Sequence, residues 1–260
     1  MAKLPPLSQV VDVARRAVVA AGNVSMGHFR RLPSVDVKPD GSPVTVADRE
    51  AEAACLAVIR EAFPAHDVLA EESGASGTGS PSRWIVDPLD GTKGFTRGAP
   101  FWGPLVAFEH EGEIVAGAMG LPVLGRTYWA ARGKGCFRDG ARCTVSKVAT
   151  WAEATLSLGG FKRLLASPQG GGVRDLVLSS ASTRGYGDLA ACALLLDGAA
   201  DAWLECGVSL WDLAAPKILV EEAGGRFTDF SGAATPSSGD AAATNGLLHA
   251  HVLGALAAPR

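Results

Sequence analysis

The sequence predicts a mixed α and β chain built as two layered halves, with a boundary between residues 140 and 150. Three observations predict this fold class. Two amphipathic helical patterns come first, closely spaced apolar strands follow, and strands then alternate with helices after about residue 145. We therefore expect an N-terminal α+β half over residues 1–145 and a C-terminal α/β half over residues 146–260.

The N-terminal half begins with two helices. Apolar residues recur at helical spacing over residues 8–30 and again after Thr45 and Asp48, a pair whose spacing resembles a capping box. Polar loops rich in proline, glycine or serine are expected over residues 33–43 and 73–82. Short apolar runs with turn signals between them predict an antiparallel meander, over residues 84–86, 105–108, 114–119 and 126–131.

The C-terminal half alternates between the two kinds of element. Strand-like runs are expected at residues 176–178, 202–204 and 226–228, and helices at residues 187–198 and 213–223. The chain has 32 glycines among 260 residues, which is well above the usual share of roughly 7 %. This excess predicts many tight turns or close backbone approaches.

Composition limits the class of function. Lys and Arg number 24 against 27 Asp and Glu, so the chain lacks the basic excess with which a dedicated nucleic-acid binder displaces counterions. Charges at Asp12, Arg15 and Arg16 argue against a signal peptide, and no apolar run is long enough for a membrane span. Five scattered cysteines without a Cys-x-x-Cys pair predict a reducing compartment. We expect a cytoplasmic protein without membrane or nucleic-acid partners.

The segment from Asp87 to Thr92 is the first of three acidic features. Asp87 follows an apolar strand, at the place where ligands collect in layered α/β folds, and Asp90-Gly91 is a turn signal. Two carboxylates, the Leu89 carbonyl and the Thr92 hydroxyl are hard oxygen donors, which suit Mg²⁺ or Mn²⁺. Backbone N–H groups after such a turn can face an anion.

The other two features are Glu71-Glu72 and Trp211-Asp212. Taken singly, each feature has a simpler explanation, because glutamates are common on surfaces and Asp-Gly is an ordinary turn. Asp212 alone would be the N-cap of the helix that follows it. The ordered combination of all three features is what indicates a site.

In combination the features resemble the inositol monophosphatase family. The resemblance implies an α-β-α-β-α layered sandwich (the sugar phosphatase fold), Mg²⁺-dependent hydrolysis of a phosphate monoester, and a homodimer. One departure is Ala70, where the family usually has glycine. The motifs that carry the resemblance are Asp87-Pro88-Leu89-Asp90-Gly91-Thr92, the upstream Glu71-Glu72, Trp211-Asp212 with Glu221-Glu222-Ala223-Gly224-Gly225, and Lys38-x-x-x-Ser42-Pro43-Val44-Thr45-x-Ala47-Asp48.

The resemblance also implies a set of metal ligands. Glu71, Asp87 and the Leu89 carbonyl would hold one ion, and Asp87, Asp90 and Asp212 would hold a second. Two or three Mg²⁺ ions are expected in the site, with Mn²⁺ as an alternative.

The remaining catalytic roles follow from the same resemblance. Asp48 and Thr92 would lie beside the ions, and Glu71 and Thr92 would orient and deprotonate the attacking water. The amides of Gly91 and Thr92 would hold phosphate oxygens. Lys38 would lie on a mobile loop near a weaker third metal site.

The same resemblance implies that Arg184, Asp188 and Glu205 lie around the alcohol part of the substrate. An acidic side chain beside the leaving group suits a cationic alcohol such as histidinol, although Asp188 could instead cap its helix. The other functions left open are a broad-specificity inositol monophosphatase, a phosphatase of 3′-phosphoadenosine nucleotides and a non-catalytic regulatory binder. The segments that resemble the histidinol-phosphate phosphatase branch of the family are residues 84–93, 122–126, 129–133, 208–212 and 221–228.

Overall fold

The computed structural model describes residues 3–31, 34–38 and 43–257. Over these residues its helices are α1 (Leu7–His28), α2 (Val46–Ala62), α3 (Thr92–Thr96), α4 (Phe161–Ala166), α5 (Gly170–Ser179), α6 (Asp188–Leu196), α7 (Leu210–Glu222) and α8 (His249–Ala257), with 3-10 turns at Pro122–Leu124 and Trp151–Glu153.

The strands of the described residues form two large sheets and one two-stranded sheet. The first sheet has the order β10-β9-β8-β7-β6-β5-β3-β4, the second has the order β12-β11-β13-β15-β14, and β1 pairs with β2. The strands are β1 (Val35–Val37), β2 (Pro43–Thr45), β3 (Asp67–Ala70), β4 (Gly74–Ser76), β5 (Ser82–Asp90), β6 (Gly103–His110), β7 (Glu113–Leu121), β8 (Arg126–Ala131), β9 (Gly135–Arg138), β10 (Ala141–Arg142), β11 (Thr155–Leu158), β12 (Ser182–Arg184), β13 (Ala202–Cys206), β14 (Arg226–Thr228) and β15 (Asp240–Thr244).

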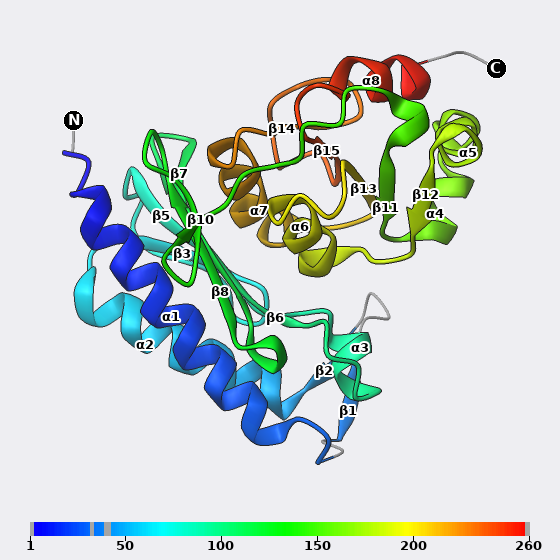
Figure 1. Cartoon of the computed structure of the whole chain (residues 1–260). Helices are drawn as coiled ribbons and strands as arrows, with labels where there is room; N and C mark the ends of the chain where they lie inside the picture. Colours follow the sequence, from blue (N-terminus) through cyan, green and yellow to red (C-terminus); the bar gives the residue numbers. More distant parts are fainter. Residues whose placement is uncertain (1–2, 32–33, 39–42, 258–260) are drawn as a thin grey trace.

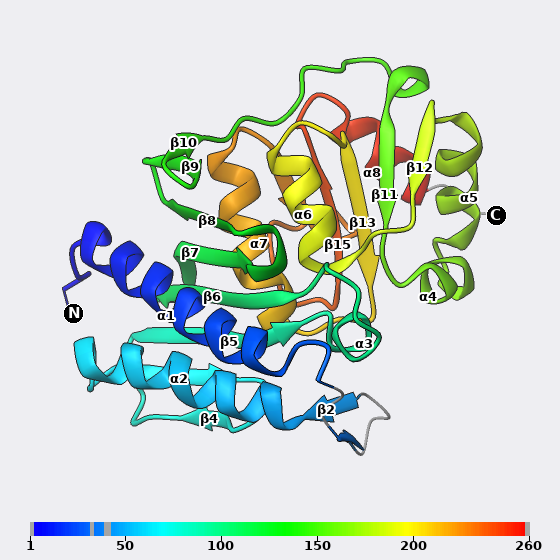
Figure 2. The same cartoon turned by 60° about the horizontal axis from the view of Figure 1, so that its bottom comes forward.

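The elements stack as five layers, which confirms the expected α-β-α-β-α fold. Helices α1 and α2 cover one face of the first sheet, and α6 and α7 lie between the two sheets (Figures 1 and 2). Helices α4, α5 and α8 lie on the outer side of the second sheet. Because side chains alternate along a strand, β5 sends Val86 toward α1 and α2 and Ile85 toward α6 and α7.

The antiparallel meander is confirmed, since β5 to β10 pair in sequence, each antiparallel to the next. Strand β3 joins the sheet parallel to β5. The pairing of β5 with β6 shifts register between Asp87 and Asp90. Pro88 lies at this irregularity, where a residue without an N–H is tolerated in a sheet.

The structure corrects several expected elements. Residues 176–178 belong to helix α5, in which Val173 and Leu176 are buried while Leu178 is exposed, because a short apolar run fits a helix as well as a strand. Strand β1 lies in the expected 33–43 loop and β4 lies in the expected 73–82 loop. Residues 39–42, which include Ser42 of the family motif, lie outside the described part of the chain.

The division into halves stays an interpretation. The first sheet comes from residues 67–142 and the second from residues 155–244. However, α6 and α7 follow the expected boundary and still pack on the first sheet, where their apolar residues share one cluster with those of β6 and β7. No helix within the described residues is both long and apolar enough to cross a membrane.

Candidate functional site

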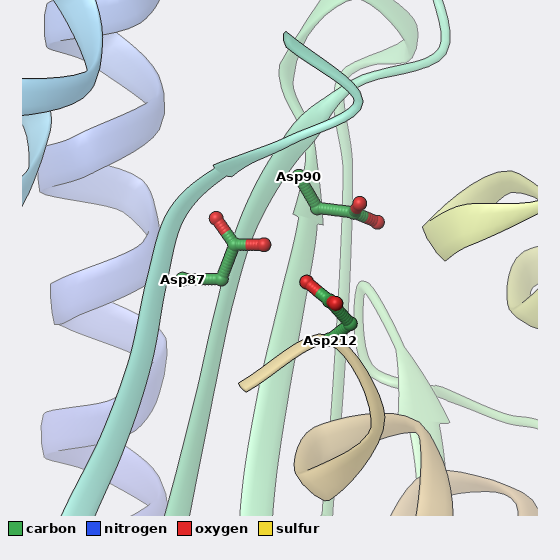
Figure 3. A group of neighbouring side chains, drawn as sticks. All are labelled: Asp87, Asp90 and Asp212. Carbon is green, nitrogen blue, oxygen red and sulfur yellow. The ribbon is translucent and has the colours of Figure 1, made fainter. Parts of the chain in front are cut away.

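Three carboxylates meet where β5 ends and α7 begins. One oxygen each of Asp87, Asp90 and Asp212 lies within 4.8 Å of the others, and Figure 3 shows the three side chains pointing toward a common centre. Asp87 is 1 % and Asp90 is 7 % exposed. The chain thus brings together in space three acids that are up to 125 positions apart.

Backbone N–H groups fix the orientation of each carboxylate. Asp87 Oδ1 accepts from the N–H of Leu89 at 2.8 Å, and Asp90 Oδ2 accepts from the N–H of Leu189 at 2.7 Å. Asp212 Oδ2 accepts from the N–H of Ser209 at 2.6 Å. Ser209 is the N-cap of α7 and Asp212 is the third residue of the helix, in a capping box, so the simpler explanation of Asp212 as the N-cap is wrong.

The electrostatics of this trio favour a bound cation. Burial raises the pKa of Asp87 well above its usual range, and the charges of Glu71, Asp90 and Asp212 raise it further. Burial and the charges of Asp188 and Asp212 do the same for the pKa of Asp90, and burial raises the pKa of Asp212 to about 6. Carboxylate oxygens are the donors that hard divalent cations prefer, so this buried acidic cluster can bind a metal ion.

Glu71 continues from β3 along the edge of this cluster. Its N–H donates to the carbonyl of Val86 on β5 at 3.1 Å, and its charge acts on Asp87. Lys38 Nζ lies 2.7 Å from Oε1 of Glu71 and 2.7 Å from Oε1 of Glu72. Burial alone would lower the pKa of Lys38, but the two carboxylates raise it above its ordinary value. The pair Glu71 and Glu72 thus carries its own cation in this structure.

Asp48 links the start of α2 to the turn after β5. The expected capping box is confirmed, because Asp48 Oδ2 accepts from both the N–H and the hydroxyl of Thr45 at 2.7 Å. Asp48 Oδ1 accepts from the Thr92 hydroxyl at 3.1 Å, and the Leu89 carbonyl lies 3.0 Å from the same hydroxyl. The Thr92 side chain is therefore held in place by two acceptors.

Gly91 must be glycine in this turn. Its φ is +84°, and a Cβ at this position would lie 2.8 Å from the carbonyl oxygen of Phe101. Any other residue would be strained by both the conformation and the contact.

A pocket of about 280 Å³ lies over the carboxylates. Its lining brings in three residues to which sequence reasoning gave no role, namely Lys93, Phe101 and Arg163. Lys93 directly follows the motif that ends at Thr92, whereas no sequence signal marked the other two. Of the residues expected in the site, those that line the pocket are Glu71, Asp90, Gly91, Thr92, Asp188 and Asp212.

Asp188 lies in the pocket wall in an unusual conformation. Its φ is +53°, a region that non-glycine residues rarely occupy and that is often found at functional sites. The N-cap of α6 is Gly187, without a side-chain cap bond, so the structure does not support capping by Asp188. The side chain is accessible to solvent. Partial desolvation raises its pKa, and the charge of Lys93 acts in the opposite direction.

Arg184 and Glu205 are not among the residues that line the pocket. Arg184 is exposed and donates from Nη1 to the carbonyl of Thr183 at 2.8 Å. Glu205 is only 2 % exposed and lies behind Asp188, with Oε2 accepting from the Asp188 N–H at 3.1 Å. Of the three residues expected around the alcohol part of the substrate, Asp188 therefore lines the pocket, Glu205 lies behind it and Arg184 lies outside it.

Comparisons with known proteins agree on one family. The family model for the inositol monophosphatase family matches residues 6–258. A histidinol-phosphatase from Mycobacterium tuberculosis is 45% identical over 227 residues, which cover 84% of this chain and 86% of the relative. A histidinol-phosphatase from Streptomyces coelicolor is 38% identical over 247 residues, covering 91% and 92%. The solved structure of an inositol monophosphatase from Anabaena has a TM-score of 0.84 at 31% identity and covers 96% of each chain.

Proposed function

The chain belongs to the inositol monophosphatase family and is a phosphoric monoester hydrolase, and we propose that the ester it hydrolyses is histidinol phosphate. The observation that carries this proposal is the pairing of a carboxylate trio, two of whose members are buried, with an acidic pocket wall. Asp87, Asp90 and Asp212 form the trio, and Asp188 is the carboxylate of the wall. In the proposed reaction, histidinol phosphate and water react at this site to give histidinol and phosphate.

We assign Mg²⁺ to the acidic cluster, in two or three sites, with Mn²⁺ as an alternative. Glu71, Asp87 and the Leu89 carbonyl would hold one ion, and Asp87, Asp90 and Asp212 would hold another. The buried, mutually repelling carboxylates and the all-oxygen donor set support this assignment. When bound, such ions supply Lewis-acid stabilisation of negative charge and lower the pKa of water.

The residues of the chain prepare the attacking water and the phosphate. The Thr92 hydroxyl directs its proton toward Asp48 and Leu89, so its lone pairs remain to accept a hydrogen bond from water. Glu71, whose side chain Lys38 orients by a 2.7 Å hydrogen bond, accepts the proton of that water as a general base. The backbone N–H groups of Gly91 and Thr92 hold phosphate oxygens.

The pocket wall suits a cationic alcohol. Histidinol carries a primary ammonium group and an imidazole ring, and a carboxylate such as Asp188 forms a charge-assisted hydrogen bond with an ammonium. Phe101 and Trp211 also line the pocket, and aromatic side chains can pack against an imidazole ring. Inositol has neither a charge nor an aromatic ring, so these groups would give it no advantage.

A turnover comparison tests the substrate. Histidinol phosphate should have a higher kcat/KM than inositol-1-phosphate. Asp188→Asn should lower kcat/KM for histidinol phosphate by about tenfold or more, the effect of losing one charged hydrogen bond, while p-nitrophenyl phosphate changes little. Glu153→Gln, an exposed acid outside the pocket, is the matched control. A preference for inositol-1-phosphate would reject this substrate, and equal losses on both esters would reject the role of Asp188.

Inositol-1-phosphate is the second candidate substrate, because an inositol monophosphatase is among the similar solved structures. The substrate comparison above discriminates the two. A non-catalytic binding function is discriminated by the absence of metal-dependent phosphate release from every ester tested.

We further propose a cytoplasmic homodimer. Five buried cysteines without disulfide bonds support a reducing compartment. The homodimer rests on membership of the family alone, and light scattering at several protein concentrations tests it.

A further inference from the structure

We propose that Glu205 is a positioning residue, which fixes the backbone of Asp188 and so aims that side chain into the pocket without touching the substrate itself. The proposal rests on the proposed function, because it assumes that Asp188 recognises the cationic alcohol. It concerns the origin of specificity, and it separates two acidic residues that the sequence presents as equivalent.

Glu205 lies in the second sheet, and its side chain is buried within the protein. It lies on β13, is 2 % exposed and does not line the pocket. Its Oε2 accepts two hydrogen bonds, from the N–H of Asp188 at 3.1 Å and from Nε1 of Trp203 at 3.2 Å. The Trp203 indole therefore holds the carboxylate at the position from which it binds Asp188.

The backbone around Asp188 is held at three points. Ser157 Oγ donates to the carbonyl of Tyr186 at 2.6 Å, Glu205 accepts from the N–H of Asp188, and Asp90 Oδ2 accepts from the N–H of Leu189 at 2.7 Å. Between these anchors Asp188 has a φ of +53°. A non-glycine residue keeps such a conformation only where its surroundings hold it there, and Glu205 supplies the contact on Asp188 itself.

Two glycines leave the space that the Glu205 carboxylate occupies. A Cβ on Gly159 would lie 1.6 Å from Oε2 of Glu205, and a Cβ on Gly187 would lie 2.5 Å from the same atom. Gly187 has a φ of −108°, so its backbone does not require glycine. A Cβ on Gly187 would also lie 2.4 Å from the Cα of Gly159, so Gly187 serves the close approach of two backbone segments as well. The three atoms nearest a Cβ on Gly159 all belong to the Glu205 side chain, so the missing side chain of Gly159 leaves the space that the carboxylate fills.

Direct contact between Glu205 and a substrate ammonium is the competing explanation. The carboxylate lies behind the Asp188 backbone and its side chain is buried. Burial, reinforced by the charge of Asp188, raises the pKa of Glu205 to about 8. Its Oε2 already accepts two hydrogen bonds from the chain, and Glu205 does not line the pocket, which favours a positioning role over direct contact.

Substitutions at Glu205 separate the two explanations. Glu205→Gln keeps an oxygen that can accept from both donors but removes the ionisable group, and Glu205→Leu keeps the size but removes the acceptor. We expect Glu205→Gln to keep the wild-type ratio of kcat/KM for histidinol phosphate over p-nitrophenyl phosphate. Glu205→Leu should lower this ratio by about tenfold, as Asp188→Asn does. A loss in Glu205→Gln equal to that in Asp188→Asn would overturn the proposal in favour of direct charge recognition.

A second variant does not alter any acidic residue. Gly159→Ala forces the Glu205 carboxylate to move, so it should lower the same substrate ratio while the melting temperature reports whether the fold is kept. Gly185→Ala is the matched control, because a Cβ there meets nothing within 4 Å, and it should leave the ratio unchanged. A wild-type ratio in folded Gly159→Ala would contradict the positioning role.

Crystal structures of the variants give a readout that needs no substrate. In Glu205→Leu or Gly159→Ala the φ of Asp188 should leave the positive region, and in Glu205→Gln it should stay there. If the wild-type enzyme shows no preference for histidinol phosphate, the proposed function fails while these structures still test the positioning role. A positive φ at Asp188 in Glu205→Leu or in Gly159→Ala would overturn the positioning role whatever the substrate.

Discussion

The N–H of Leu189 donates a 2.7 Å hydrogen bond to Oδ2 of Asp90, although 99 positions separate the two residues. This bond joins the end of β5, which carries two of the clustered carboxylates, to the first turn of α6, which carries Asp188. The acidic cluster and the pocket wall that carries Asp188 are thus joined by a hydrogen bond. A displacement of the acidic cluster or of the start of α6 is therefore transmitted to the other through the carboxylate of Asp90.

Two substitutions at Asp90 separate its charge from this bond. Asp90→Asn keeps an oxygen for the Leu189 N–H, whereas Asp90→Ala leaves that N–H buried without an acceptor. Both should abolish activity, but Asp90→Ala should be less stable than Asp90→Asn by about 1–3 kcal/mol, the cost of an unsatisfied buried donor. Denaturant unfolding in EDTA measures the difference. Equal free energies of unfolding would show that the bond does not stabilise α6.

Asp87→Asn should remove activity and keep the fold. Asp87 is assigned to both ions, and its carboxylate is buried among like charges that raise its pKa. Turnover should fall below detection, while the melting temperature in EDTA should not decrease, because one member of a repelling group has been neutralised. Asp201→Asn, a buried acid that binds Ser146 and Thr155 instead, should lose stability and keep turnover. Wild-type turnover in Asp87→Asn would refute the shared-ligand role.

The acidic cluster was the part of the site that the sequence predicted most directly. Asp87, Asp90 and Gly91 lie within one motif, and the turn chemistry of Asp-Gly is local. Asp212 was found only because its motif recurs in order with the others. A carboxylate oxygen of Asp212 lies within 4.8 Å of oxygens of Asp87 and Asp90 because α7 packs against the first sheet. No local sequence pattern encodes that packing.

The relation between Asp188 and Glu205 was beyond sequence reasoning. The family resemblance places both acidic residues around the alcohol part of the substrate, so the sequence predicts the same role for both. Their different positions depend on the positive φ of Asp188 and on the burial of β13. Strand β15, with the sequence Asp-Ala-Ala-Ala-Thr, was not predicted for a similar reason. Alanine has low strand propensity, and the strand forms because β13 and β14 pair with it on both sides.

Without metal, stability should fall as the pH rises. The folded-state pKa of Asp212 is raised to about 6, above its value in the unfolded chain. From about pH 4 upward the unfolded chain therefore loses protons that the folded chain keeps, which favours unfolding. Burial and neighbouring charges also raise the pKa values of Asp87 and Asp90, so the loss of stability continues toward higher pH. The melting temperature in EDTA should therefore decrease over this range.

Mg²⁺ should oppose this loss of stability. Metal that binds only the folded state raises its stability, and it binds the ionised carboxylates, so the gain in melting temperature should grow with pH. His249, whose pKa burial lowers to about 4, acts in the opposite direction but equally in both series. A melting temperature that does not change on addition of millimolar Mg²⁺ at any pH would count against the metal site.

The hydroxyl of Thr92 should matter more than its methyl group. Thr92→Ser keeps the bonds to Asp48 and Leu89, whereas Thr92→Val removes them and leaves a buried Asp48 oxygen unpaired. We expect kcat to stay near wild type in Thr92→Ser and to fall by about a hundredfold or more in Thr92→Val. Thr96→Val on the same helix, where the hydroxyl donates to the carbonyl of Lys93 at 3.1 Å, is the control. A comparable kcat in Thr92→Val and Thr96→Val would exclude the hydroxyl from catalysis.

Lys38 should compete with the first ion for Glu71. Its ammonium lies 2.7 Å from Oε1 of both Glu71 and Glu72, so a divalent ion that uses Glu71 approaches a carboxylate already bound to a cation. Lys38→Met removes the charge and keeps the length of the side chain, and it should strengthen Mg²⁺ binding by about three- to tenfold. Lys38→Arg retains the charge and should bind Mg²⁺ as the wild type does. Calorimetric titration of the EDTA-treated proteins measures the affinity, and equal or weaker binding by Lys38→Met would show that the ammonium assists the ion instead of competing with it.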